Sequence, residues 1–398
     1  MSEFKPRIAI LGAGPTGLEA ALAAVEGGFP FTLYEAAPGA AGNVRAWGHV
    51  RLFTPWEMNV SPRMRRHLEA AGREVPGGSE CPTGHTLAER VFEPVAALPE
   101  IAPHLRLGTR VLSVGREGLL KHEEIATPAR GRHPFRLLLC DGSGREWTET
   151  ADVVLDTTGT WGNPNTLGDG GIFAPGERAL GGEIRHDIPD FESHAASWTG
   201  KTVVVAGAGH SAQTAVRDLA RLAQQAPGTE VIWLLRNPEP GWGTHPGDPL
   251  PGRAGLAADA QALAAGSSPA VKVRRGAVVE EIAKPNGRFE IVVRNGSGRE
   301  TLAADRVISL TGSVGDHGLY RQLQVHECYA TCGPINLSAA ILGAGSSDCL
   351  AQTTHGAETL KNPEPNFFIL GAKSYGRNNT FLMRIGWEQV GEVFGLLG

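Results

Sequence analysis

The segment Arg7-Ile8-Ala9-Ile10-Leu11-Gly12-Ala13-Gly14-Pro15-Thr16-Gly17, near the N-terminus, decides the fold class. Its first five residues form a short apolar run that predicts a buried strand, and the alanine-rich residues 18–25 predict a helix directly after the glycines. A second short apolar run, residues 31–34, predicts the next strand. Strand, glycine turn, helix and strand in this order are typical of an α/β unit that binds a dinucleotide.

Each glycine of the turn has a mechanical role in such a unit. Gly12 permits the tight turn, Gly14 lets the backbone approach a pyrophosphate, and Gly17 lets the helix pack closely on the strand. Pro15 and Thr16 lie at the start of the helix, where backbone N–H groups attract an anion. The second strand ends on Glu35, which we expect to accept hydrogen bonds from a ribose.

The same pattern occurs a second time, beginning at Lys201. Residues 202–206 predict the strand, residues 211–224 the helix and residues 230–235 the next strand. The turn between them predicts five further cofactor contacts: Gly207, Gly209, His210, Ser211 and Ala212. Ala212 stands where the third glycine would be, which the motif allows.

The residue at the tip of the second strand differs between the two copies. The first copy ends on Glu35 and the second on Arg236. A carboxylate would repel a 2′-phosphate, whereas a guanidinium can pair with one. We therefore expect the second site to take NADP in preference to NAD, although Arg236 could also be a solvated loop residue.

A second duplication defines the domains. Residues 151–159 recur as residues 304–312, and each copy is a buried strand that runs into a Thr-Gly turn, Thr158-Gly159 and Thr311-Gly312. Two glycine turns that alternate with two Thr-Gly strands describe one nucleotide-binding domain inserted into another. We predict an α/β protein with two Rossmann-like domains, the first made of residues 1–160 and 305–398 and the inserted one of residues 161–304.

Composition excludes several other classes of protein. The net charge of −5 and the lack of a long basic run give no reason to expect nucleic-acid binding. No apolar stretch approaches the roughly 18 residues of a membrane helix. The 5 cysteines are unevenly spaced and do not form a disulfide framework. The expected setting is therefore the cytoplasm, with no metal site and no membrane partner.

The residues quoted so far resemble the flavoproteins with two dinucleotide-binding domains, which include class B flavin monooxygenases and thioredoxin-reductase-like enzymes. The resemblance spans nearly the whole chain and implies FAD at the first glycine turn and NADP at the second. Residues 158–164 and 180–191 resemble the crossing and the signature of the monooxygenases, with His186 in register and Leu180 in place of an aromatic residue. Phe191 falls one position late. The resemblance implies a small-molecule substrate, molecular oxygen and a possible homodimer.

The C-terminal part also resembles this group, where a final strand and helix return to FAD. Residues 366–372 predict the strand, residues 374–380 a polar loop and residues 381–397 the closing helix. The group usually has Gly-Asp at the turn, but this chain has Gly371-Ala372, so Arg377, Asn378 or backbone amides could replace the acid. The remaining cofactor contact that we predict is Val111.

Catalytic side chains are hard to identify because the cofactors supply most of the chemistry. Asn59, with Arg51 and His49, is a weak candidate near the flavin. The cysteines Cys328 and Cys332 form the only close pair, and they could serve a disulfide or quinone reductase instead of a monooxygenase. A flavin-binding sensor without turnover is the third alternative.

Overall fold

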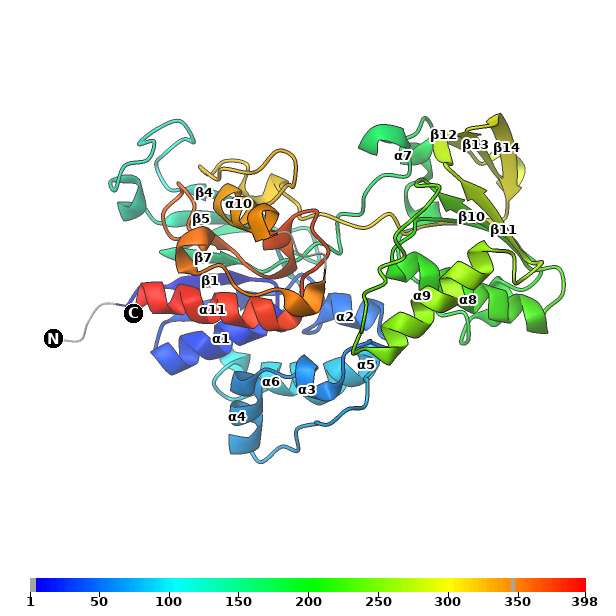
Figure 1. The fold of residues 1–398 in the computed structure, drawn as a ribbon. Coiled ribbons are helices and arrows are strands. Elements are labelled where there is room, and N and C mark those ends of the chain that lie inside the picture. The colour runs from blue at the N-terminus through cyan, green and yellow to red at the C-terminus, as the bar shows by residue number, and fades with distance from the viewer. Residues whose placement is uncertain (1–4, 345–347) are drawn as a thin grey trace. The chain divides into compact units, whose positions relative to one another are not determined.

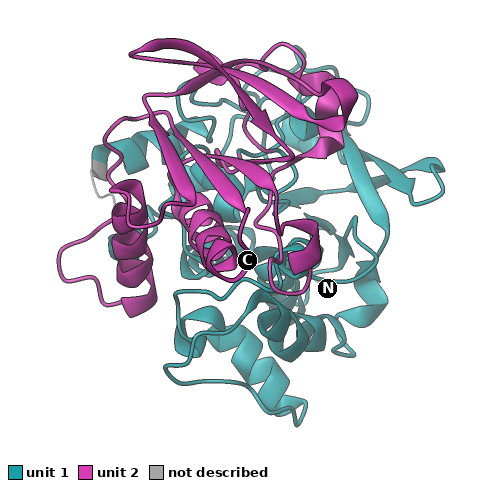
Figure 2. Ribbon diagram, turned by 90° about the vertical axis from the view of Figure 1, so that its right-hand side faces the viewer, with its two compact units in different colours: residues 1–163, 314–398 teal, residues 164–313 magenta. Residues whose placement is uncertain are grey.

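The computed structural model describes residues 5–344 and 348–398, which form two compact units. Residues up to 163 and from 314 to 398 make up the first unit, and residues 164–313 make up the second (Figure 2). The second unit is inserted into the first along the chain, as predicted. Its end lies beyond the boundary expected at residue 304, because strand β15 (Arg306–Ser309) pairs with β9 (Thr202–Ala206) of the second unit.

A five-stranded parallel sheet, in the order β16-β7-β1-β2-β3, forms the centre of the first unit. Its strands are β1 (Ile8–Leu11), β2 (Phe31–Tyr34), β3 (Leu105–Arg106), β7 (Val153–Asp156) and β16 (Phe367–Ile369). β1 pairs with β2 on one side and β7 on the other. The carboxyl ends of these strands therefore meet at one edge of the sheet, where α/β proteins bind their ligands.

The parallel sheet is covered on both faces. Helices α1 (Pro15–Gly27) and α11 (Met383–Leu397) run side by side on one face, and β4 and β5 of an antiparallel sheet lie on the other (Figure 1). That sheet consists of β4 (Thr109–Arg116), β5 (Phe135–Asp141) and β6 (Glu146–Ala151). Alanines of α1 are fully buried, so the helix packs closely. The shorter helices of this unit are α2 (Gly42–Ala46), α3 (Trp56–Asn59), α4 (Pro62–Ala70), α5 (Gly84–Leu87), α6 (Glu93–Ala96) and α10 (Ile335–Ala344).

The second unit repeats this layered plan. Its parallel sheet has the order β11-β10-β9-β15-β8, and the three-stranded antiparallel sheet β12-β13-β14 shares a hydrophobic core with it. The elements not yet given are β8 (Ile184–Arg185), β10 (Glu230–Leu235), β11 (Val271–Arg275), β12 (Val278–Ala283), β13 (Phe289–Asn295), β14 (Gly298–Ala304), α7 (Glu177–Leu180), α8 (His210–Gln225) and α9 (Pro251–Ala264). Both units are thus Rossmann-like, as the duplicated sequence predicted.

The element boundaries differ from the expected ones mainly at helix starts. α1 begins at Pro15 rather than residue 18, because a proline is tolerated in the first helical turn, where its missing N–H has no intrahelical partner. The segment after β16 is a 3₁₀ helix, Gly371–Tyr375, where we expected the glycine turn at residues 371–372 and the start of a polar loop at residue 374. The closing helix begins at Met383.

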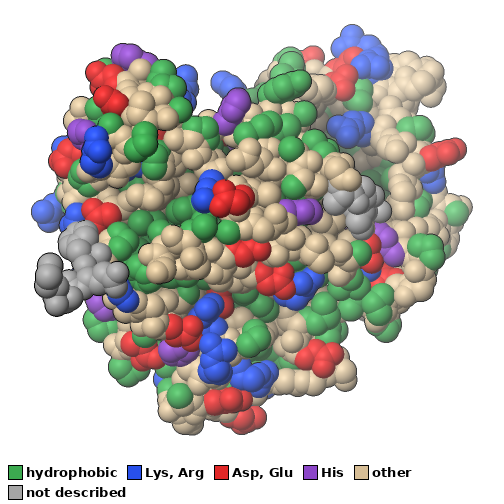
Figure 3. Space-filling view, turned by 60° about the vertical axis from the view of Figure 1, so that its left-hand side comes forward, with side chains coloured by type: hydrophobic (Ala, Val, Ile, Leu, Met, Phe, Trp, Pro, Cys, Tyr) green, Lys and Arg blue, Asp and Glu red, His purple; other side chains and the backbone are tan. Residues whose placement is uncertain are grey.

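Charges of both signs are interspersed on the face of the molecule drawn in Figure 3. Among the ion pairs of the first unit, Glu26 pairs with Arg63 at 2.8 Å and with Arg66 at 2.9 Å. No helix within the described ranges is both long enough and apolar enough to span a bilayer.

Candidate functional site

The first glycine turn joins β1 to α1 and has the conformation that anion binding requires. Gly12 adopts φ +97°, where a side chain would be strained. A Cβ on Gly17 would lie 1.8 Å from the Gly12 carbonyl oxygen, so this glycine is needed for packing of the helix on the strand. A Cβ on Gly14, by contrast, would meet no atom within 4 Å. Gly14 thus faces open space, where its backbone is accessible to a ligand.

Glu35 follows β2 and is held in place by backbone N–H groups. One carboxylate oxygen accepts the N–H of Ala13 and the other accepts the N–H of Ala37, each at 2.8 Å. A carboxylate has about four acceptor positions, so two remain for hydroxyl donors. The geometry suits the ribose-binding role that the sequence predicted.

A cavity of about 1240 Å³ opens at this edge of the sheet in the first unit. Its volume exceeds the roughly 300–1,000 Å³ of sites for drug-sized molecules, so an extended ligand fits. Most of the residues predicted for the first cofactor line it: Gly12, Gly14, Pro15, Thr16, Glu35, Val111, Thr158, Gly159 and Gly371. Residues as distant in sequence as Glu35 and Gly371 therefore contribute to one site.

The C-terminal wall of the cavity differs from the expectation. Gly371, at φ +73°, and Lys373 line it, but Arg377 and Asn378 do not. The Asn378 side chain accepts the N–H and the hydroxyl of Thr380 within its own loop. Lys373, which the sequence analysis did not single out, is buried and pairs with Asp156 of β7 at 2.6 Å. A lysine directly after the glycine turn was the only signal in the sequence.

Asn59, the weak catalytic candidate, lies on the cavity wall but its amide is already engaged. Its Nδ2 donates to the carbonyl oxygens of Thr54 and Pro55 at 2.7 and 2.9 Å, and its Oδ1 accepts the Thr54 hydroxyl at 2.9 Å. Asn59 is also only 1% exposed. This arrangement fixes the turn that precedes α3. Arg51 donates to the carbonyl oxygen of Cys81, and neither Arg51 nor His49 lines the cavity.

The close cysteine pair lies in the loop that precedes α10. Cys328 and Cys332 are both free thiols, and the N–H of Cys332 donates to the carbonyl oxygen of Cys328 at 2.8 Å. Neither residue lines the described cavity. The other described cysteines, Cys81, Cys140 and Cys349, do not line it either.

The second glycine turn, between β9 and α8, reproduces the geometry of the first. Gly207 adopts φ +126°, and a Cβ there would lie 2.3 Å from the Leu310 carbonyl oxygen. A Cβ on Gly209 would again meet nothing within 4 Å. The predicted residues His210, Ser211 and Ala212 form the first turn of α8, and Thr311 and Gly312 follow β15 at the same sheet edge. This turn can therefore hold a second pyrophosphate.

Two tryptophans, Trp233 of β10 and Trp242 of the loop that follows, lie beside the second glycine turn. Trp233 of β10 donates its indole N–H to the Gly207 carbonyl oxygen at 2.8 Å, and its ring lies 5.5 Å from that of Trp242. Gln213 bridges the Ala208 and Trp242 carbonyl oxygens. Burial, the largest cause, together with nearby Arg253 lowers the pKa of His210. Trp242 thus holds the start of the loop that follows Gly241 against the turn.

Arg236 is exposed at the carboxyl end of β10, as the sequence predicted. β11 pairs alongside β10 and ends on Arg275, opposite Leu235. Arg275 donates to the Pro238 carbonyl oxygen at 2.6 Å, within the loop that follows Arg236. Two guanidinium groups therefore belong to the edge that a 2′-phosphate would approach.

The residues of the first unit fit FAD. Gly14 leaves its backbone open to a pyrophosphate, Glu35 retains acceptors for a ribose, and the cavity extends to apolar walls at Trp47, Leu52 and Phe381. Within the described residues, no group of three or more His, Cys, Asp or Glu side chains could hold a metal ion.

Comparisons with known proteins agree with this architecture. Residues 6–328 match the model of the family described as pyridine nucleotide-disulphide oxidoreductase. No curated protein matches the sequence. The structure resembles bacillithiol disulfide reductase Bdr (YpdA) from Bacillus cereus, with 18% identity, coverage of 99% of both chains and a TM-score of 0.69. It also resembles ornithine hydroxylase (PvdA) from Pseudomonas aeruginosa, with 16% identity, 99% coverage of both chains and a TM-score of 0.64. It resembles T. acidophilum thioredoxin reductase with 15% identity, coverage of 99% of both chains and a TM-score of 0.58. At these identities the likeness shows a shared fold.

Proposed function

The chain belongs to the pyridine nucleotide-disulphide oxidoreductase family, and we propose that it is an FAD-dependent monooxygenase that uses NADPH. Its substrate would be a small molecule with a nucleophilic nitrogen or sulfur atom, or a carbonyl group. Molecular oxygen would be the second substrate. The family and the neighbouring folds support an oxidoreductase with FAD and a pyridine nucleotide, and the wall of the first cavity argues against reduction of a disulfide through a cysteine pair.

The observation that carries this proposal is the lack of a thiol on the cavity wall. A reductase that acts through a redox-active cysteine pair needs one thiolate beside the flavin, because the cysteine sulfur passes electrons from the flavin to the substrate disulfide by thiol–disulfide exchange. None of the described cysteines lines the cavity that fits FAD. Apolar side chains such as Val44, Met58 and Leu87 occupy the wall instead, together with Trp47 and Phe381.

The residues of the site would bind and orient the cofactor, and they would exclude water. Bound FAD would supply the electron transfer from the nicotinamide to oxygen. The N–H groups at the start of α1 would hold its pyrophosphate, and Glu35 would accept its ribose hydroxyls. Trp47, Leu52 and Phe381 would keep water from the reacting region, which limits side reactions there.

We also propose NADPH as the preferred reductant. The argument rests on Arg236, which is exposed at the tip of β10 and can pair with a 2′-phosphate. Arg275 of the neighbouring strand adds positive charge, while its guanidinium donates to the Pro238 and Ala264 carbonyl oxygens. The corresponding position of the first unit carries Glu35, which suits an unphosphorylated ribose.

Oxygen accounting on the purified holoprotein tests the proposal. NADPH and oxygen consumption, hydrogen peroxide release and product formation are followed with a panel of amines, thioethers and ketones under ¹⁸O₂. We expect an accepted substrate to give equimolar NADPH and oxygen use, a product that contains ¹⁸O and little peroxide. Reduction of a disulfide or a quinone without oxygen uptake would instead identify a reductase. A protein that binds FAD but does not oxidise NADPH would be a sensor.

A further inference from the structure

A buried ion pair lies at the cavity wall of the first unit, where β7 and the turn after β16 meet: Lys373 lines the cavity and Asp156 lies behind it. The Lys373 Nζ donates to Asp156 Oδ2 at 2.6 Å, and the two side chains are 1% and 0% exposed. The charge of Lys373 also lies 5.1 Å from the centre of the Tyr320 ring. Buried ion pairs contribute little net stability compared with apolar residues of similar size. This pair therefore calls for a role other than holding the fold together.

Both members of the pair contact the hydroxyl of Thr158. That hydroxyl donates to Asp156 Oδ1 at 2.7 Å and accepts an N–H of Lys373 at 3.2 Å. The Thr158 backbone N–H also points to Asp156 Oδ1, at 3.2 Å. An ionised aspartate only accepts hydrogen bonds and an ammonium only donates them. The single proton of the Thr158 hydroxyl is thus committed to Asp156.

The polarity of the hydroxyl is consequently fixed. A hydroxyl oxygen has two acceptor positions, and Lys373 uses one of them. Thr158 is exposed and lines the cavity, whereas Asp156 is buried and does not. The position that remains on Thr158 can therefore only accept a hydrogen bond from a ligand in the cavity. Leu370, Gly371 and Ala372, on the same wall, offer no side-chain acceptor.

We propose that Asp156 and Lys373 are positioning residues that hold the Thr158 hydroxyl as an obligatory acceptor for a hydroxyl group of the bound cofactor, on its sugar or ribityl chain. This inference rests on the proposed binding of FAD in the cavity. The two buried charges act through Thr158, so a hydrogen-bond donor on the ligand is accepted and a carbonyl or phosphate oxygen at that point is disfavoured.

Titration of apoprotein with FAD, followed by flavin fluorescence, tests the role of Thr158. We expect Thr158→Val to weaken FAD binding about tenfold, which corresponds to one net hydrogen bond. The matched control Thr158→Ser retains the hydroxyl and should bind as the unaltered protein does. A set of FAD analogues, each lacking one ribityl or ribose hydroxyl, identifies the partner of Thr158. The analogue that lacks the partner hydroxyl should bind the unaltered protein and Thr158→Val equally well. Equal weakening of FAD and every analogue by Thr158→Val would overturn the proposal.

A double-variant cycle tests the positioning role of Asp156. In Asp156→Asn the new amide can donate to Thr158, which would release the hydroxyl proton towards the cavity. We expect this variant to lose about as much FAD affinity as Thr158→Val, and the double variant Asp156→Asn/Thr158→Val to lose no more. Additive losses would show a purely structural effect and overturn the positioning role. Unchanged FAD affinity in all variants would overturn this inference while leaving FAD binding intact, whereas failure of the unaltered protein to bind FAD would overturn both.

Discussion

Two glycines of the first glycine turn, Gly14 and Gly17, have different roles: one leaves space for the ligand and the other permits packing of the helix. A side chain at Gly14 would project into the open cavity, whereas a side chain at Gly17 would collide with the Gly12 carbonyl oxygen and the Thr157 hydroxyl. We expect Gly14→Ala to fold normally and to lose FAD, because the added methyl group occupies the space that the pyrophosphate needs. Thermal unfolding and the flavin content of the purified variant measure the two effects.

Gly17→Ala serves as the matched comparison. Its methyl group would lie 1.8 Å from the Gly12 carbonyl oxygen, so α1 must shift away from β1. We expect a lower unfolding temperature and poor recovery of folded protein. A Gly14→Ala variant that retains stoichiometric FAD would contradict the assignment of this turn.

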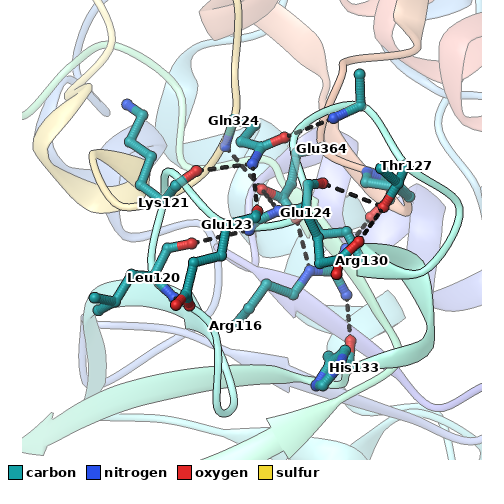
Figure 4. A network of polar contacts seen from close by, with 12 residues as sticks. Arg116, Leu120, Lys121, Glu123, Glu124, Thr127, Arg130, His133, Gln324 and Glu364 are labelled. Carbon is teal, nitrogen blue, oxygen red and sulfur yellow. Dashed lines mark hydrogen bonds and ion pairs between the residues drawn. The ribbon is translucent and has the colours of Figure 1, made fainter.

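At the scale of an element, a buried charge network fixes the loop between β4 and β5. Glu364 pairs with Arg116 of β4 at 2.6 Å and with Arg130 at 2.9 Å, and all three side chains are fully buried (Figure 4). Glu364 also accepts the Gln324 N–H at 2.7 Å, and Arg130 donates to the carbonyl oxygens of Leu120 and Glu123. Burial, as the largest cause, and the neighbouring Arg130 lower the pKa of Arg116. The single negative charge of Glu364 thus partly neutralises the buried positive charges of two arginines.

Removal of this carboxylate charge should destabilise the first unit. We expect Glu364→Gln to lower the free energy of unfolding by about 3–5 kcal/mol, because both arginines remain buried with less compensation. Glu358→Gln is the control, since its pair with Lys361 is exposed and is worth at most about 1 kcal/mol. Urea unfolding of the three proteins measures the difference. Equal midpoints for both variants would show that the network is not needed for stability.

For the whole molecule, the duplicated architecture predicts two cofactor sites that can be disabled separately. Gly209 in the second unit has the same open surroundings as Gly14 in the first. We expect Gly209→Ala to retain its full FAD content but to be reduced by NADPH at least about tenfold more slowly, because only the second pyrophosphate site is obstructed. Anaerobic stopped-flow reduction measures the rate, and dithionite, which needs no nucleotide site, should reduce the variant normally. Loss of FAD from Gly209→Ala would contradict separate sites.

The sequence by itself determined the strands that flank the two glycine turns, the glycine turns themselves, the difference between Glu35 and Arg236, and the insertion of one unit into another. It did not predict the two antiparallel sheets. These features could be predicted because they depend on local backbone conformation and on short periodic patterns. Residues 202–206 and 230–235 form strands within the expected limits. The second unit extends past residue 304, because strand pairing, which is not local, places β15 beside β9.

Only the tertiary structure decided which side chains share the cavity. It placed Lys373 against Asp156 and Thr158, engaged the Asn59 amide with its own turn, and left Arg377 off the cavity wall. The physical reason is that hydrogen-bond partners depend on distances between segments far apart in sequence, and a buried charge must find its partner wherever the fold brings one. The sequence therefore predicted both glycine turns as cofactor sites, but it did not predict which polar groups line the first cavity.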